Sequence, residues 1–230
     1  MFEHIGVDLG YDDLEAKTSE SGRLYETPDG VKYPSITTVL SILSQDAIQA
    51  WRRRVGEEEA NRISSRASTR GTAVHAIIED YLNNVENYKE KYPLNIIDNF
   101  LPLKQILDER IGKIYAQEVP MFSHHLRVAG RVDCVAEFDG KISIIDFKTS
   151  RKIKKKSYIE NYFMQESAYA IMFEERTGIP ITQLVTLIAV DDEEPQVFIE
   201  HRDNWTKPLI ETIEKYEARL ERKRRNEGSA

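Results

Sequence analysis

The chain has 230 residues, of which 31% are charged and 40% hydrophobic, a composition typical of a folded protein rather than a disordered one. No apolar run approaches the roughly 20 residues that span a bilayer, no secretory signal is visible, and the single cysteine, Cys134, excludes a disulfide framework, a four-cysteine zinc site and a four-cysteine iron–sulfur cluster. We therefore expect a cytoplasmic protein with no membrane contact. The net charge of −7 is unevenly distributed, because six of the nine residues from Lys148 to Lys156 are basic, so a polyanionic partner is not excluded.

The N-terminal part is predicted to begin with a loosely held segment and a hairpin. Residues 1–22 are polar, rich in turn-forming residues and without periodicity. Short extended runs on either side of the turn sequence at residues 28–30 predict a hairpin over residues 23–33. Ser35 is a suitable N-cap for a short helix over residues 36–43.

Helices are predicted for the next part of the chain. A charged, amphipathic stretch over residues 46–65 is followed by a second helix, which we expect to start at Ser68 or Thr69 and to carry a wide apolar face over residues 73–82. After a polar connection, near-heptad apolar spacing predicts a helix over residues 95–114.

The periodicity changes at Tyr115 to one typical of strands. Strands are predicted over residues 116–122, 126–138 and 141–147, with a tight Asp139-Gly140 turn between the second and the third. The remaining elements are a helix over 158–176, strands over 183–190 and 196–200, and a closing helix over 204–225. This order, without repeats or a linker, predicts a single α/β domain over residues 1–230.

Two acids and a lysine are predicted to meet at the end of the central hairpin. Asp133 lies seven residues before Gly140 and Asp146 six residues after it, so the turn places the carboxylates almost opposite each other, about 5 Å apart. Two carboxylates this close repel, and a hard divalent cation relieves the repulsion. Lys148 follows Asp146 by two residues and therefore shares its face of the strand. Such a group can bind Mg²⁺, orient a water molecule and stabilise charge developing on a phosphate.

These hairpin residues resemble the PD-(D/E)XK nuclease superfamily. The segment Arg70-Gly-Thr-Ala-Val-His75 resembles the G-x-x-x-H motif of its RecB-type exonuclease branch, and Gln165-Glu-Ser-Ala-Tyr169 resembles the Q-x-x-x-Y motif. Glu118 stands where related enzymes have a further acid. A closer similarity, over roughly residues 23–175, is to the mitochondrial genome maintenance exonuclease family and its phage-encoded relatives.

The resemblance implies a fold. We expect a restriction-endonuclease-like core, in which a central mixed β-sheet is flanked by helices, over residues 67–230. An N-terminal hairpin and a helical cover over the sheet edge are expected within residues 1–66.

The resemblance also implies a metal site for one or two Mg²⁺ or Mn²⁺ ions. Its implied ligands are the side chains of His75, Asp133, Asp146 and Glu118 and the main-chain carbonyl of Phe147. The catalytic set would comprise Asp133 and Asp146 together with Lys148, which would position the attacking water and balance the charge on the phosphorane. Gln165 and Tyr169, one helical turn apart, would orient the lysine or the scissile phosphate.

The implied function is that of a metal-dependent DNA exonuclease that hydrolyses phosphodiester bonds from free single-stranded ends. The expected DNA contacts are Arg70, Arg151, Lys152, Lys154, Lys155 and Lys156. Two alternatives stay open: a structure-specific or flap endonuclease that uses the same site, and a non-catalytic DNA-binding module that kept the fold. Metal-dependent cleavage of linear but not circular single strands distinguishes the three.

Overall fold

The structure, a computed structural model, describes residues 1–19 and 22–227 and is built around a five-stranded mixed sheet. The strand order is β4-β5-β6-β7-β8, and each neighbouring pair is antiparallel except β6 and β7, which are parallel. The predicted α/β class with a central mixed sheet is therefore confirmed. The strands are β4 (Ile111–Ser123), β5 (Val128–Phe138), β6 (Lys141–Ser150), β7 (Gln183–Val190) and β8 (Gln196–His201).

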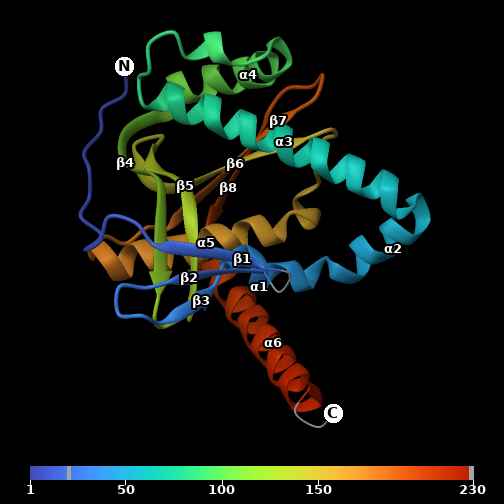
Figure 1. The fold of residues 1–230 in the computed structure, drawn as a ribbon. Helices are drawn as coiled ribbons and strands as arrows, with labels where there is room; N and C mark the ends of the chain where they lie inside the picture. The colour runs from blue at the N-terminus through green and yellow to red at the C-terminus, as the bar shows by residue number, and fades with distance from the viewer. Residues whose placement is uncertain (20–21, 228–230) are drawn as a thin grey trace.

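Helices cover both faces of this sheet, as Figure 1 shows. The first face packs against α3 (Glu57–Leu82) and α4 (Leu94–Arg110). The second packs against α1 (Ile36–Leu40), α5 (Glu160–Thr177) and α6 (Asp203–Glu227). Short 3₁₀ helices lie between these elements at Ser41–Leu43, Tyr88–Lys91 and Lys156–Tyr158.

The alternation of side chains along β6 divides the core between the two faces. Ile145 and Phe147 belong to the apolar cluster beneath α3 and α4, whereas Ile144 belongs to the cluster that includes α1, α5 and α6. Because side chains alternate along a strand, Asp146 and Lys148 lie on the same side as Ile144, facing α5. This placement brings the polar residues of β6 to the helix that follows it.

The helices before the sheet are divided at a different residue from the predicted one. α2 (Gln45–Val55) ends at Gly56, whose φ of 87° lies outside the helical region, and α3 then runs unbroken to Leu82. The prediction of a new helix start at Ser68 or Thr69 is therefore wrong. Among the described residues of α3 before Val74, only Ala60 is buried, so the first half of the helix has no apolar face that the sequence pattern could reveal. Its Glu, Arg and Ala residues nevertheless have high helix propensity and favour an unbroken helix.

The junction between α4 and β4 also differs from the prediction. The helix ends at Arg110 rather than Ile114, and the strand starts at Ile111 rather than residue 116. Arg110 pairs with Asp139 of the β5–β6 turn at 2.5 Å and so ties the helix end to the hairpin. Ile111 and Ile114 have a spacing that suits the end of a helix, and periodicity alone therefore places the boundary too late.

The N-terminal segment is more ordered than predicted. β1 (Glu15–Ser19), β2 (Gly22–Glu26) and β3 (Lys32–Pro34) form a second, antiparallel sheet, and the predicted hairpin is confirmed as β2–β3. The prediction of a loosely held lead over residues 1–22 is therefore wrong for Glu15–Ser19 and Gly22, which form strands. Residues 1–14 form no helix or strand and have a single bridge, from His4 to Ile114, while residues 20–21 lie outside the described residues. All five side chains of β1 are exposed, so no alternation in its sequence marks it as a strand.

This small sheet packs against the end of β4 and β5. Tyr25 and Tyr33 are buried with Phe122 and Ala129, and Ser35 forms a bridge with Ala129. α2 behaves differently, because it buries none of its described residues and projects away from the sheet with the start of α3 (Figure 1). None of the described helices combines the length and the hydropathy needed to cross a membrane.

Candidate active site and metal centre

The β5–β6 hairpin carries two carboxylates just beyond its last ladder pair. Cys134 pairs with Ile145, and Asp133 and Asp146 are the next residues in that register. The Oδ2 atom of Asp133 accepts a hydrogen bond of 2.8 Å from the Phe147 N–H, so a side chain occupies the place of a backbone partner. The Asp146 side chain is 1% exposed and that of Asp133 12%. The hairpin therefore presents one buried and one partly accessible carboxylate.

Lys148 forms an ion pair with the buried carboxylate. Its Nζ atom lies 2.5 Å from Asp146 Oδ2. Burial and the charge of Asp133 raise the pKa of Asp146 to about 6, although Lys148 opposes this shift. Burial by itself lowers the pKa of Lys148, but the two carboxylates outweigh it and hold that pKa above its ordinary value. Lys148 is therefore a cation at neutral pH.

The helix that follows the basic segment, α5, adds an amide and a phenol to this group. Gln165 Nε2 donates to Asp146 Oδ1 and to the Tyr169 hydroxyl, both at 3.3 Å. Burial and the charge of Asp133 raise the pKa of Tyr169 well above its ordinary value, so its hydroxyl keeps its proton. Gly130 makes room for this side chain, because a Cβ atom there would lie 2.8 Å from the Tyr169 ring. The structure thus brings together Asp146, Gln165 and Tyr169 on one side of the sheet.

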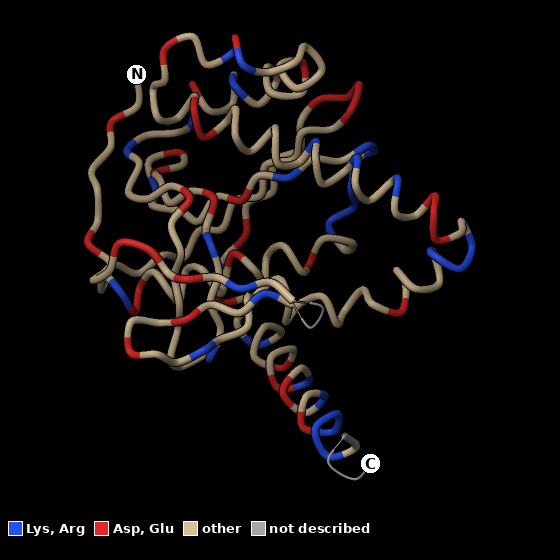
Figure 2. Tube along the Cα trace, in the orientation of Figure 1, with Lys and Arg blue, Asp and Glu red and all other residues tan. Residues whose placement is uncertain are grey.

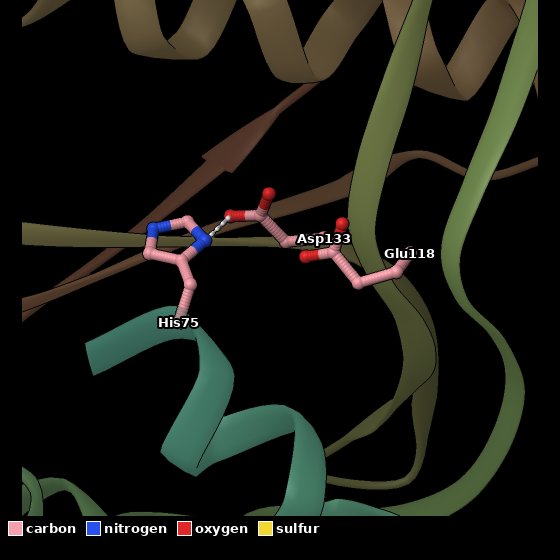
Figure 3. Close-up of side chains that lie close together, drawn as sticks. All are labelled: His75, Glu118 and Asp133. Atoms are coloured by element: carbon pink, nitrogen blue, oxygen red, sulfur yellow. Dashed lines mark ion pairs between the residues drawn. The ribbon is translucent and has the colours of Figure 1, made fainter. Parts of the chain in front are cut away.

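A second group of ligands forms around Asp133. His75 extends from α3, and its Nδ1 atom lies 3.6 Å from Asp133 Oδ2. Glu118 lies on β4 at a backbone φ of 49°, a left-handed conformation that few residues other than glycine adopt. Figure 3 shows the imidazole and the two carboxylates pointing toward one another from the helix and the strands. Among the described residues, one ligand atom from each of these three side chains lies within 4.8 Å of the others.

The electrostatics of this second group favour a bound cation. Burial, together with the charges of Asp133 and Glu79, raises the pKa of Glu118 to about 7. Two carboxylate oxygens and an imidazole nitrogen are donors that suit Mg²⁺ or Mn²⁺. Asp146 lies outside the three-residue group, because its Oδ2 atom pairs with Lys148 and its Oδ1 atom accepts a hydrogen bond from Gln165. The residues present therefore fit a divalent metal.

An open cleft of about 520 Å³ is lined by His75, Glu118 and Asp133 and, on the side of α5, by Gln165 and Tyr169, whereas Asp146 and Lys148 do not line it. One part of its wall comes from α3 and the sheet, and another comes from the N-terminal sheet and α1. The second part supplies an arginine, a tyrosine and two hydroxyl side chains: Arg23, Tyr25, Ser35 and Thr37. The N-terminal part of the chain is thus a wall of the candidate site as well as a neighbour of the core.

The predicted DNA contacts fall into two sets. Arg70 pairs with Asp191 at 2.5 Å, and Lys156 pairs with Glu200 at 2.5 Å, so the charges of these two cations are partly balanced within the chain. The other set lies on the segment after β6, and Figure 2 shows Lys and Arg on this segment and along α2 and α3. A hollow of about 510 Å³ is lined by residues of α3 and of this segment, among them Arg70, Arg151, Lys152 and Lys154, while Lys155 is exposed beside them.

Sequence reasoning missed one buried acid next to the site. Glu166 is fully buried on α5 and accepts a hydrogen bond from Thr186, the register partner of Asp146 on β7. Its Oε2 atom has no hydrogen-bond partner among the described residues. Burial and the charge of Asp146 raise the pKa of Glu166 well above its ordinary value, which favours the neutral carboxylic acid. A glutamate that follows Phe163, Met164 and Gln165 and precedes a largely apolar run was the signal that could have identified it.

The chain is similar to a family model and to several known proteins. The family model described as the PD-(D/E)XK nuclease superfamily matches residues 49–226. The mitochondrial genome maintenance exonuclease 1 of Homo sapiens is 28% identical over 56% of this chain and 40% of its own length. The same protein of Xenopus tropicalis is 27% identical over 70% and 50%, and that of Mus musculus 31% identical over 52% and 38%. The chain thus spans half or less of the length of the curated relatives it matches. A solved structure of a putative exonuclease from Eubacterium rectale aligns over 66% of both chains with 15% identity and a TM-score of 0.45.

Proposed function

We propose that this chain, which belongs to the PD-(D/E)XK nuclease superfamily, is a Mg²⁺- or Mn²⁺-dependent deoxyribonuclease that degrades DNA from free single-stranded ends. The observation that carries the proposal is the convergence of His75, Glu118 and Asp133 beside the Asp146–Lys148 ion pair, at the side of one cleft. The names of the matched relatives, which are exonucleases, support the choice of an end-directed reaction.

The residues of this chain divide the chemistry between them. Asp133, Asp146, His75, Glu118 and the Phe147 carbonyl would hold the metal, which would supply Lewis-acid stabilisation of the phosphate and a more acidic bound water.

Lys148 supports the reaction as a cation. As a cation, it would stabilise negative charge on the phosphate. Gln165 holds the Asp146 carboxylate through its amide, and Tyr169 in turn receives a hydrogen bond from that amide. These contacts fix the carboxylate before the substrate arrives, which is how preorganised sites lower a barrier.

The basic hollow supports a nucleic-acid substrate. Arg151, Lys152 and Lys154 follow Lys148 closely in sequence, so phosphates of a strand held in the cleft would reach them within a few nucleotides. Contacts of this kind release counterions, and binding would weaken steeply with salt. The N-terminal wall of the cleft, which includes the start of α1, would provide the cover under which a single strand enters.

The experiment that tests the proposal compares linear and circular single-stranded DNA of the same sequence in Mg²⁺. The proposal predicts degradation of the linear strand while the circle stays intact. Cleavage of both at similar rates would replace the exonuclease with an endonuclease on the same site. Binding of both without cleavage, in Mg²⁺ and in Mn²⁺, would leave a DNA-binding module that kept the fold.

A further inference from the structure

Tyr162 contacts the catalytic lysine without belonging to any of the motifs above. The Nζ atom of Lys148 lies over its ring, 5.1 Å from the centroid. Tyr162 lies in the first turn of α5, three residues before Gln165, and so shares the side of the helix that faces the site. Its ring packs against the buried cluster of Ile159, Phe163, Ile188 and Val190, which limits its movement.

We propose that Tyr162 is a positioning residue that holds the Lys148 ammonium group against its ring face and aims it at the scissile phosphate. The proposal rests on the nuclease function proposed above. A cation over an aromatic face is attracted by the ring quadrupole, and the attraction grows when both groups are shielded from water. Lysine needs such a partner because its four-carbon stem is flexible.

The other neighbour of the ammonium group explains why a ring is useful here. Asp146 holds Lys148 by charge, but it is also a proposed metal ligand, and a carboxylate that binds a cation has less charge to share with a lysine. The ring does not bind a metal, so it attracts the Lys148 ammonium group whether or not Asp146 is bound to a cation. Burial also raises the pKa of Tyr162, although Lys148 opposes the shift, so the ring stays an uncharged phenol.

Kinetics of two variants separate positioning from DNA stacking and from a role of the hydroxyl group. Tyr162→Leu keeps an apolar side chain but loses the ring, whereas Tyr162→Phe keeps the ring and loses only the hydroxyl. We expect kcat on a linear single strand to fall about tenfold in Tyr162→Leu with KM changed less than about twofold, and to stay near the wild-type value in Tyr162→Phe. A raised KM with unchanged kcat in Tyr162→Leu would overturn the proposal in favour of stacking on DNA. Equal loss of kcat in both variants would overturn it in favour of a role for the hydroxyl.

A spectroscopic measurement tests the same contact without activity. In protein labelled with ¹³C at the lysine Cε position, a ring face shifts the Hε signal of Lys148 upfield, and the Lys148→Arg variant identifies that signal by its absence. The shift should persist in Tyr162→Phe and vanish in Tyr162→Leu. An unshifted Lys148 signal in the wild-type protein would refute the proposal. Because this readout needs no cleavage, a wild-type protein that fails to cut DNA would contradict the proposed function while the spectrum still decides the placement of the lysine.

Discussion

Two groups of residues at the candidate site differ in how deeply they are buried. The closed side, from β6 and α5, consists of the buried Asp146, Gln165, Glu166 and Tyr169 together with Lys148, whose side chain is 21% exposed. An ion pair joins Asp146 to Lys148, and hydrogen bonds join Gln165 to Asp146 and Tyr169. The open side, from α3, β4 and β5, consists of His75, Glu79, Glu118 and Asp133, which remain partly accessible, with the His75 side chain 29% exposed. The closed side is built before any ligand arrives, whereas the open side has room for one.

Because of this difference in burial, we expect the closed side to determine the catalytic rate and the open side to determine the affinity for the metal. Residues of the closed side are fixed by the core, so their loss should lower the rate of the bound complex. Residues of the open side have carboxylates with repelling charges and space for a cation, so their loss should first weaken metal binding. The predictions below are arranged to test that division.

The largest effect is expected from Lys148→Ala. Removing one preorganised cation from the closed side should lower kcat by at least about a hundredfold. DNA affinity, measured by fluorescence anisotropy, should change little, because the neighbouring basic residues remain. Lys152→Ala provides the contrast: it should weaken binding in a salt-dependent way and leave kcat at saturating DNA unchanged. If Lys148→Ala lost binding and kept its rate, Lys148 would belong to the DNA contacts.

On the open side, His75→Ala should raise the metal concentration needed for half-maximal rate by about tenfold to a hundredfold. Excess Mn²⁺ should restore the rate better than excess Mg²⁺, because Mn²⁺ tolerates an incomplete ligand set more readily. The exposed His125 supplies the matched control, since His125→Ala should leave the titration unchanged. A lowered melting temperature with an unshifted titration would assign His75 to packing.

The pH dependence of metal binding should follow Glu118 and Asp146. Their pKa values of about 7 and about 6 mean that protons compete with the metal in a range where ordinary carboxyl groups are ionised. The half-maximal metal concentration should therefore rise roughly tenfold between about pH 8 and about pH 6. Glu118→Gln should flatten the upper part of that curve. A metal requirement independent of pH in this range would contradict the assignment of Glu118 to the site.

The smallest effect concerns the stability of the closed side. The pKa of Glu166 is raised in the folded protein, which therefore keeps a proton that the unfolded chain loses near the ordinary glutamate pKa. The contribution of this proton to the free energy of unfolding is complete below the ordinary pKa and is lost as the pH rises toward the folded-state pKa. A glutamine side chain at this position does not titrate. The melting temperature of Glu166→Gln, relative to that of the wild type, should therefore rise by a few degrees between about pH 5 and about pH 8.

The control for this experiment is the exposed Glu58, whose Glu58→Gln variant should show no such pH-dependent gain. A difference between Glu166→Gln and the wild type that stays constant with pH would show that Glu166 is ionised in the folded state.

Much of the central fold was predictable, because its strands and helices bury regular apolar patterns. The prediction for β7, residues 183–190, matches the structure, and the Asp139-Gly140 turn fixes the register of β5 and β6. Elements without a buried stripe were misplaced: β1 has only exposed side chains, and the start of α3 is almost entirely solvated. In these regions the backbone conformation of single residues determines where a helix ends, as the positive φ of Gly56 does between α2 and α3. Apolar periodicity does not detect such positions.

Residues of the candidate site could be predicted where their relative positions follow from spacing within one hairpin or one helix. The spacing around a single turn places Asp133 opposite Asp146, next to the pair of Cys134 and Ile145. One helical turn separates Gln165 from Tyr169. Contacts between distant segments were not visible in the sequence. The pairing of Arg70 with Asp191 depends on how α3 crosses the sheet, and local spacing contains no information about that crossing.

The central claim, that a metal held by these carboxylates drives cleavage of DNA, is tested most directly with Asp146→Asn. The wild type and this nearly isosteric variant, matched in circular dichroism, are given an end-labelled linear single strand in Mg²⁺, in Mn²⁺ and in excess chelator. We predict cleavage by the wild type in either metal, none in chelator, and loss of at least about a hundredfold in the variant. Wild-type turnover in excess chelator, or a variant as fast as the wild type, would contradict the account.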